Sequence, residues 1–460
     1  MSLFFVFLFS LFLTLQTCEA GLPEKIYGVN LGSWLIIEPW MMPQKWIDMG
    51  GQLCNKCSKC IASEFDFAAA YPESVDSKLA QHWETWFNQD DVNTIVEYGL
   101  NTVRIPLGFW IIEALVDRET EYYPRGGLKH LRRGLKQLQE ANLSVILDHH
   151  GLPGAQSPNQ MFTGRCTEDV QFYNDHNYHR ALVWTAVMTG LAHLDPVFGN
   201  VASIQAVNEP IQDARKTPGY GRFSKNFVKT IRAVESLLGI HVKRDEQALT
   251  SSHNFIAVME RAVRKYYFPR EVRNAVRDAA PILQAIAEEL EIEPFFFNYR
   301  SGQHREPLTT NFMDISWQWN DPFNPATAAI GPQTYDNHLY YSFGGVAAPN
   351  EEAHLTHICN LNRVEDDERR GNSPLFFGEW WIAPQFDASD EFLRKFADAQ
   401  KYAFNKSKGW IFWNFKLEMS HRTRNYAKTR SYFEGVRRGY LTKDAAALHD
   451  PHVCDPYRRD

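Results

Sequence analysis

The sequence repeats one pattern of segments several times, and this repeat limits the folds that the chain can adopt. A short apolar run is followed by a loop with polar residues, and then by a segment with helical spacing. The first four runs lie at 26–31, 101–106, 143–148 and 203–207, and the segment at 82–98, between the first two runs, has apolar residues at helical spacing. Because parallel strands need crossover connections that are usually helical, this order predicts a parallel sheet in an α/β fold. Further runs at 310–316, 336–342, 375–379 and 409–415 bring the number to eight and predict a (β/α)₈ barrel, also called a TIM barrel.

The stretch between the fourth and fifth runs departs from this order. It contains charged amphipathic segments, such as 254–266 and 270–291. We interpret it as the fourth barrel helix followed by a helical insertion at about 235–308, before strand five. A separate inserted domain is the alternative. The expected organisation is one barrel domain over residues 21–460, which suits a chain of 460 residues.

The first 20 residues form a separate unit. Residues 3–15 are almost entirely Phe, Leu and Val, and Cys18 and Ala20 place small residues before Gly21. This pattern is typical of a secretory signal peptide, although no positive charge precedes the apolar run. The run is shorter than the roughly 20 residues of a membrane span, and a retained N-terminal anchor is the alternative. We therefore expect a secreted protein, extracellular or associated with a cell wall.

Cysteine usage agrees with export. An even number of cysteines in an exported chain indicates disulfide bonds, although it leaves their pairing open. The cluster C-N-K-C-S-K-C at 54–60 could instead hold a metal ion, but it lacks a nearby second pair with the spacing of a zinc site. Removal of residues 1–20 leaves six cysteines: Cys54, Cys57, Cys60, Cys166, Cys359 and Cys454.

Two glutamates at the ends of predicted strands are the main candidates for chemistry. Glu209 follows Asn208 and precedes a proline, which ends the fourth strand because it has no N–H and a fixed φ. Glu379 ends the seventh run. The carboxyl ends of the strands carry the active site in this type of barrel, so the two side chains can converge there. Arg104, among apolar neighbours near the end of the second strand, needs an acidic partner. An ordinary turn is the alternative reading of N-E-P.

Other candidates are aromatic or charged residues near strand ends. Glu38 lies among bulky apolar residues beside Trp40, so it faces either a ligand or a structural partner. His338 and Tyr340 share one face of the sixth strand. Trp413 could form a platform for a sugar, and a core tryptophan is the alternative.

Composition narrows the class of ligand. Aromatic residues make up 14% of the chain, with 13 Trp, and aromatic rings pack well against the apolar faces of sugars. The net charge is −7 and no long basic run is present, which argues against a nucleic-acid partner.

Seven short motifs in this order resemble glycoside hydrolase family 5, in the clan of retaining β-glycosidases with (β/α)₈ barrels. The first motif and the extended D-H-H-G-L-P-G-A-Q resemble the branch of the fungal exo-β-1,3-glucanases. The helical insertion and residues 328–347 depart from that branch. The motifs are G-V-N-L-G-S-W (28–34), V-R-I-P (103–106), D-H-H-G (148–151), N-E-P (208–210), H-L-Y (338–340), G-E-W (378–380) and W-I-F-W (410–413).

The resemblance implies roles for individual residues. Glu209 would be the general acid/base and Glu379 the nucleophile of a double displacement. Arg104 and Tyr340 would keep Glu379 ionised by lowering its pKa. Neither a metal nor an organic cofactor is needed. The residues expected to contact substrate are Glu38, Trp40, Arg104, His150, Asn208, His338, Tyr340 and Trp413.

The function implied is hydrolysis of β-glucosidic bonds by a secreted retaining enzyme of the exo-β-1,3-glucanase or β-glucosidase type. We expect a monomer without a membrane span after signal removal, acting on an oligosaccharide, polysaccharide or β-glucoside. β-1,6-Glucan, glycolipid glucosides and plant diglycosides are alternative substrates. A transglycosylase is one alternative function. A catalytically silent barrel that binds glucan or acts as a surface interaction protein is another.

Overall fold

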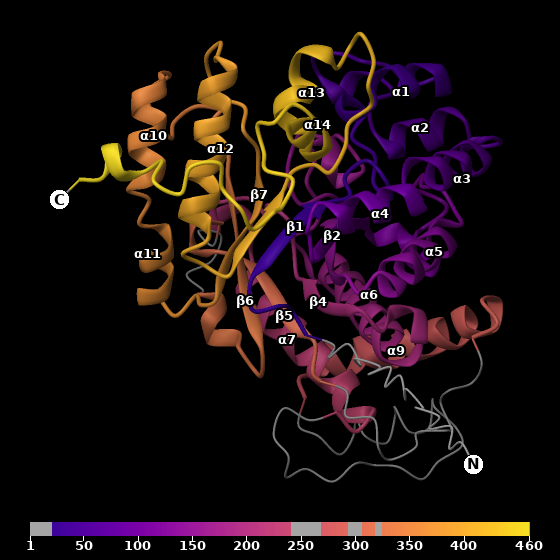
Figure 1. Ribbon diagram of the computed structural model, residues 1–460. Helices are drawn as coiled ribbons and strands as arrows, with labels where there is room; N and C mark the ends of the chain where they lie inside the picture. Colours follow the sequence, from indigo (N-terminus) through magenta and orange to yellow (C-terminus); the bar gives the residue numbers. More distant parts are fainter. Residues whose placement is uncertain (1–20, 241–267, 293–305, 318–323, 460) are drawn as a thin grey trace, which may run out of the picture.

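The computed structural model describes residues 21–240, 268–292, 306–317 and 324–459. The expected signal peptide lies outside this part of the chain, as do two segments of the expected insertion. Eight parallel strands pair in chain order, and β8 returns to pair with β1, which closes the barrel (Figure 1). The prediction of a (β/α)₈ barrel is therefore confirmed.

The strands are short and almost wholly buried, as expected when helices cover the outside of a parallel sheet. Four of them, β4, β5, β6 and β8, end two or three residues before the end of the corresponding predicted run. At these points the chain turns into loops at the carboxyl-terminal mouth. The strands are β1 (Ile26–Asn30), β2 (Thr102–Gly108), β3 (Ser144–Gly151), β4 (Val201–Gln205), β5 (Thr309–Met313), β6 (Gln333–Leu339), β7 (Leu375–Trp380) and β8 (Gly409–Phe412).

The helices follow the expected order with one difference. The helical segment at 82–98 is two helices, because Asn88 interrupts it with a capping box: its side chain accepts from the amide of Asp91, whose carboxylate accepts from the Asn88 amide. The helices are α1 (Pro43–Met49), α2 (Glu64–Ala70), α3 (Val75–Trp86), α4 (Gln89–Glu97), α5 (Gly127–Glu140), α6 (Asp175–Leu194), α7 (Tyr220–Leu237), α9 (Arg270–Glu289), α10 (Glu351–Cys359), α11 (Arg363–Arg369), α12 (Asp390–Phe404), α13 (Arg424–Arg430) and α14 (Tyr432–Arg437).

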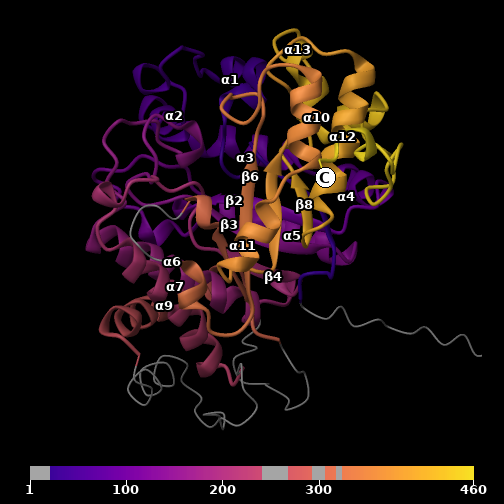
Figure 2. The same ribbon diagram turned by 90° about the vertical axis from the view of Figure 1, so that its left-hand side faces the viewer.

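The described part of the expected insertion contains helix α9. Helix α9 packs against α6 and α7, at the end of the molecule away from α1 and α13 (Figures 1 and 2). This cover explains why α6 has 15 of its 20 residues buried. A helix covered on both sides needs no polar face.

Three disulfide bonds join the six cysteines: Cys54–Cys60, Cys57–Cys166 and Cys359–Cys454. All three cysteines of the 54–60 cluster are in disulfides, so the metal-site alternative is wrong. Within the described residues, no helix has the length and apolar character needed to cross a bilayer.

Candidate active site

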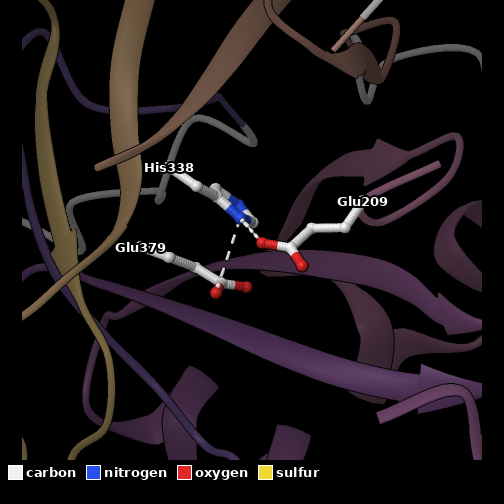
Figure 3. A group of neighbouring side chains, drawn as sticks. All are labelled: Glu209, His338 and Glu379. Carbon is white, nitrogen blue, oxygen red and sulfur yellow. Dashed lines mark hydrogen bonds and ion pairs between the residues drawn. The ribbon is translucent and has the colours of Figure 1, made fainter. Parts of the chain in front are cut away.

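Two glutamates converge at the carboxyl-terminal mouth of the barrel (Figure 3). Glu209 follows β4, and Glu379 lies in β7. One oxygen of each carboxyl group and one ring nitrogen of His338 all lie within 4.8 Å of one another. Two carboxyl groups about 5–5.5 Å apart can flank the anomeric carbon of one sugar.

The backbone at Glu209 is held in an uncommon conformation. Its φ is +40°, in the left-handed region that few residues other than glycine adopt. The Ser157 hydroxyl donates to the Glu209 carbonyl at 2.5 Å, and the Gln156 amide donates to the Asn208 carbonyl at 3.0 Å. These bonds fix the turn that directs the Glu209 side chain into the mouth.

Arg104 lies fully buried beneath the two glutamates and organises the floor of the site. Its Nη1 donates to Glu379 Oε1 at 3.0 Å, and its Nη2 donates to Asn208 Oδ1 at 2.8 Å. Asp148 Oδ2 lies 3.1 Å from Nη2, and Asp336 Oδ2 lies 3.5 Å from Nε. Burial acts to lower the pKa of the guanidinium, but these carboxylates outweigh it and raise the pKa. The cation therefore positions Glu379 and Asn208 together.

His338 connects the two glutamates. Its Nδ1 lies 2.7 Å from Glu209 Oε1 and 3.4 Å from Glu379 Oε2, and its Nε2 lies 3.5 Å from Asp336 Oδ2. Burial would lower the pKa of His338, but Glu379 and Asp336 outweigh it and raise the pKa well above its ordinary value. These carboxylates therefore favour the protonated ring, in which Nδ1 donates a hydrogen bond to Glu209.

The spacing of Glu209, His338 and Glu379 would also suit a metal ion. The polar atoms of the three side chains already have hydrogen-bond partners: His338 Nδ1 lies 2.7 Å from Glu209 Oε1, and Arg104 and Tyr340 donate to Glu379. The cluster therefore fits a set of hydrogen-bonded acids and bases better than a metal centre.

The pKa of Glu379 differs from the prediction. Oε2 of Glu379 accepts a hydrogen bond from the Tyr340 hydroxyl at 2.8 Å. Burial nevertheless raises the pKa of Glu379, and the nearby Glu209 adds to this, while His338 and Arg104 act in the opposite direction. Arg104 acts in the expected direction, but burial outweighs it, so the expected net lowering of the pKa of Glu379 is wrong.

His150 and Trp413 form one side of the site. The two rings stack with centroids 5.5 Å apart and an interplanar angle of 7°. His150 Nδ1 lies 2.5 Å from Asp148 Oδ2, and this contact fixes the ring orientation and directs Nε2 away from Asp148. Burial would raise the pKa of Asp148, but Arg104 and His150 outweigh it and keep the pKa below its ordinary value.

Glu38 and Trp40 form another part of the wall. The Trp40 indole donates to Glu38 Oε2 at 2.9 Å. Glu38 Oε1 is buried and has no hydrogen-bond partner among the described residues. Burial raises the pKa of Glu38 to about 7. Of the two expected alternatives, this geometry favours a side chain that faces a ligand.

A cavity of ≈ 700 Å³ opens above these residues. It brings together every predicted site residue except Arg104, which lies under its floor. Glu38, Trp40, His150, Asn208, Glu209, His338, Tyr340, Glu379 and Trp413 line it.

Sequence reasoning missed several residues of this site. Asp336 accepts from the Gly378 amide at 2.8 Å, and a Cβ at Gly378 would lie 2.0 Å from the same oxygen. A signal was present, because Asp336, His338 and Tyr340 are spaced by two along β6. The missed residues that line the cavity are Gln160, Phe162, Gln212, Ser316, Trp317, Leu339, Phe343, Val346, Arg363, Trp381 and Arg430.

A closed parallel barrel with two carboxyl groups at this separation in its mouth is the arrangement of an enzyme that cleaves glycosidic bonds. The family model described as Cellulase (glycosyl hydrolase family 5) matches residues 68–416. The chain belongs to glycosyl hydrolase family 5 and is an O-glycosyl hydrolase.

Individual relatives agree with this family. The chain is 30% identical to glucan endo-1,6-beta-glucosidase B of Emericella nidulans, over 94% of this chain and 88% of that one. It is 26% identical to glucan 1,3-beta-glucosidase of Schwanniomyces occidentalis, over 86% and 83% of the two chains. The crystal structure of rutinosidase from Aspergillus niger has a similar fold, with a TM-score of 0.57, 16% identity, and 90% and 97% coverage.

Proposed function

We propose that this chain is a secreted, retaining β-glycosidase that hydrolyses β-glucan by double displacement. The observation that carries the proposal is the approach of Glu209 and Glu379 to within 4.8 Å around His338. The expected signal peptide at 1–20 and three disulfide bonds support export.

In the first step, a carboxylate oxygen of Glu379 attacks the anomeric carbon while the bond to the leaving oxygen breaks. Glu209 donates its proton to that oxygen. The His338 imidazolium holds Oε1 of Glu209 by a hydrogen bond, which leaves Oε2 to carry the proton. Asn208 is held by a hydrogen bond from Arg104. It would hydrogen-bond the sugar hydroxyl on the carbon next to the anomeric carbon.

In the second step, water attacks the same carbon and the bond to Glu379 breaks. Glu209 takes the proton of this water and returns to its starting state. Because the carbon is inverted twice, the product first released has the β configuration.

For the substrate, we favour β-1,6-glucan. The relatives named glucan endo-1,6-beta-glucosidase B are 30% and 31% identical over 94% of the chain, whereas the named 1,3-beta-glucosidase is 26% identical over 86%. β-1,3-Glucan is the second candidate, supported by that relative and by the motifs at 28–34 and 148–156.

The purified full chain should release reducing sugar from a β-1,6-glucan such as pustulan faster than from the β-1,3-glucan laminarin. NMR should show the β-anomer before mutarotation. Glu379→Gln should lower kcat on either substrate by at least about 10³-fold, because the amide is a poor nucleophile. The exposed Glu352→Gln on α10 is the matched control.

Three results would count against this function. Normal turnover by Glu379→Gln would rule out the nucleophile, and an α-anomer formed first would rule out retention. Faster release from laminarin would favour the β-1,3-glucan assignment. If a sugar acceptor takes the place of water, longer products accumulate at high substrate concentration.

A further inference from the structure

Arg430, at the end of α13, lines the cavity from an aromatic setting. Its guanidinium carbon lies 4.4 Å from the ring centroid of Trp381, 5.3 Å from Tyr426 and 5.9 Å from Trp40. Trp40 and Trp381 line the same cavity. These contacts fix the guanidinium by packing and cation–π attraction.

Within the described part of the chain, the N–H donors of the Arg430 side chain have no acceptor. Among the described residues, its side chain makes no hydrogen bond, and no carboxylate lies within ion-pair distance. Its Nε is buried. Arg104, in contrast, meets several acceptors within 3.5 Å. Buried donors are nearly always satisfied, so the position of Arg430 on the cavity wall suggests that a ligand accepts from it.

The position of Arg430 in the barrel indicates which sugar of a bound substrate it would contact. Glu209, which serves the leaving group in the proposed mechanism, follows β4. Arg430 belongs to the segment after β8, which lies across the barrel from β4. The sugars on the non-reducing side of the cleaved bond therefore extend toward Arg430. In the proposed mechanism, Asn208 and Tyr340 would contact the first of these sugars.

The ligand at Arg430 should be neutral. The proposed substrate is a neutral glucan, and the cavity is lined by acidic side chains (Glu38, Glu209 and Glu379) as well as the basic side chains of Arg363 and Arg430. A guanidinium presents two parallel N–H donors, which can meet two neighbouring sugar hydroxyls.

We propose that Arg430 determines specificity by binding two neighbouring hydroxyls of the second glucosyl unit on the non-reducing side, with Trp381 as its support. This proposal rests on the proposed function, because it takes its direction along the cavity from the role of Glu209.

The kinetic test compares two aryl glycosides. 4-Nitrophenyl β-glucoside fills only the first sugar position, whereas 4-nitrophenyl β-gentiobioside also fills the second. In Arg430→Met, the ratio of kcat/KM for the gentiobioside to that for the glucoside should fall at least tenfold, mainly through a higher KM for the gentiobioside. Arg430→Lys keeps the charge but loses the paired donors, so it should show the same fall.

Arg424→Met, at an exposed position of the same helix, is the matched control, and its ratio should stay at the wild-type value. Thermal unfolding checks that each variant is folded. An unchanged ratio in folded Arg430→Met, equal losses on both substrates, or full recovery in Arg430→Lys would overturn the proposal.

A binding measurement separates this proposal from the proposed function. In the Glu379→Gln background, calorimetry with the β-1,6-linked trisaccharide gentiotriose should show binding that weakens at least tenfold when Arg430→Met is added. If the wild type hydrolyses no glucan but this difference appears, the function fails and the Arg430 contact stands. No difference, or no binding in either variant, overturns the Arg430 contact.

Discussion

His338 contacts both Glu209 and Glu379, so a change in its protonation state should affect both glutamates. Its pKa is raised because Glu379 and Asp336 stabilise the imidazolium more than burial disfavours it. The pKa of His338 in the folded protein lies above the unfolded value of about 6.5. Its contribution to the free energy of unfolding is therefore fully present below pH about 6.5. It is lost as the pH rises through the folded pKa.

Substitution of His338 should therefore change the pH profile as well as the rate. We expect His338→Gln to lower kcat by about 10- to 100-fold and to remove the decline of activity that accompanies deprotonation of the imidazolium at high pH. The measurement is kcat and kcat/KM on an aryl β-glucoside between pH 5 and 10. His421→Gln, at an exposed position, is the control. An unshifted basic limb in His338→Gln would contradict this assignment.

The strand-end residues of the site could be predicted because their places depend on local sequence. Glu209 and Glu379 stand where a buried strand stops, and parallel strands bring such positions to one mouth. Arg430 could not be found in this way, because it lies on a short helix beyond β8 and its setting is made by Trp40 and Trp381 from distant parts of the chain. The raised pKa of Glu379 depends on its burial in the folded barrel, which no local pattern shows.

At the scale of elements, α9 should stabilise the barrel by covering α6. Leu283 is buried, and a Cβ on Gly190 of α6 would lie 2.6 Å from its Cδ1, so the two helices approach closely there. Leu283→Ala should lower the free energy of unfolding by about 2–5 kcal/mol.

The control for this prediction is Gln284→Ala, at the neighbouring exposed position, which should change stability by less than about 0.5 kcal/mol. Urea unfolding followed by fluorescence measures both variants. Equal stability of Leu283→Ala and the wild type would mean that α9 contributes little to the fold.

The boundaries of elements were less predictable than their order. The helix expected at 82–98 divides at Asn88 because a capping box there outweighs a continuous apolar pattern. After β6 and β8 the chain continues with aromatic residues beyond the last strand residue, and two of them, Tyr340 and Trp413, line the cavity. Apolar periodicity alone does not separate a strand from the wall of a site.

For the whole molecule, the Cys359–Cys454 disulfide should matter more than Cys54–Cys60. The first spans 95 residues and ties the C-terminal segment to α10, whereas the second spans 6. The chain-entropy model gives about 4–5 kcal/mol for the long loop and about 2 kcal/mol for the short one. Replacing both cysteines of each pair by serine should therefore lower Tm more for the long-range pair. Equal shifts would contradict this order.

The closed barrel itself was predictable, since eight repeats of strand and crossover leave few other topologies. The pairing of the six cysteines was not, because it depends on contacts between distant loops.

Arg104 forms ion pairs with three carboxylates, those of Asp148, Asp336 and Glu379. This arrangement affects the covalent intermediate of the proposed reaction. When Glu379 is esterified by the sugar, it no longer carries a negative charge, and a cation paired with it alone would be left without a counterion. Asp148 and Asp336 still neutralise Arg104 at that moment, so the guanidinium has no electrostatic reason to shift. The floor can therefore remain unchanged while the ester waits for water, and the same geometry serves both halves of the cycle.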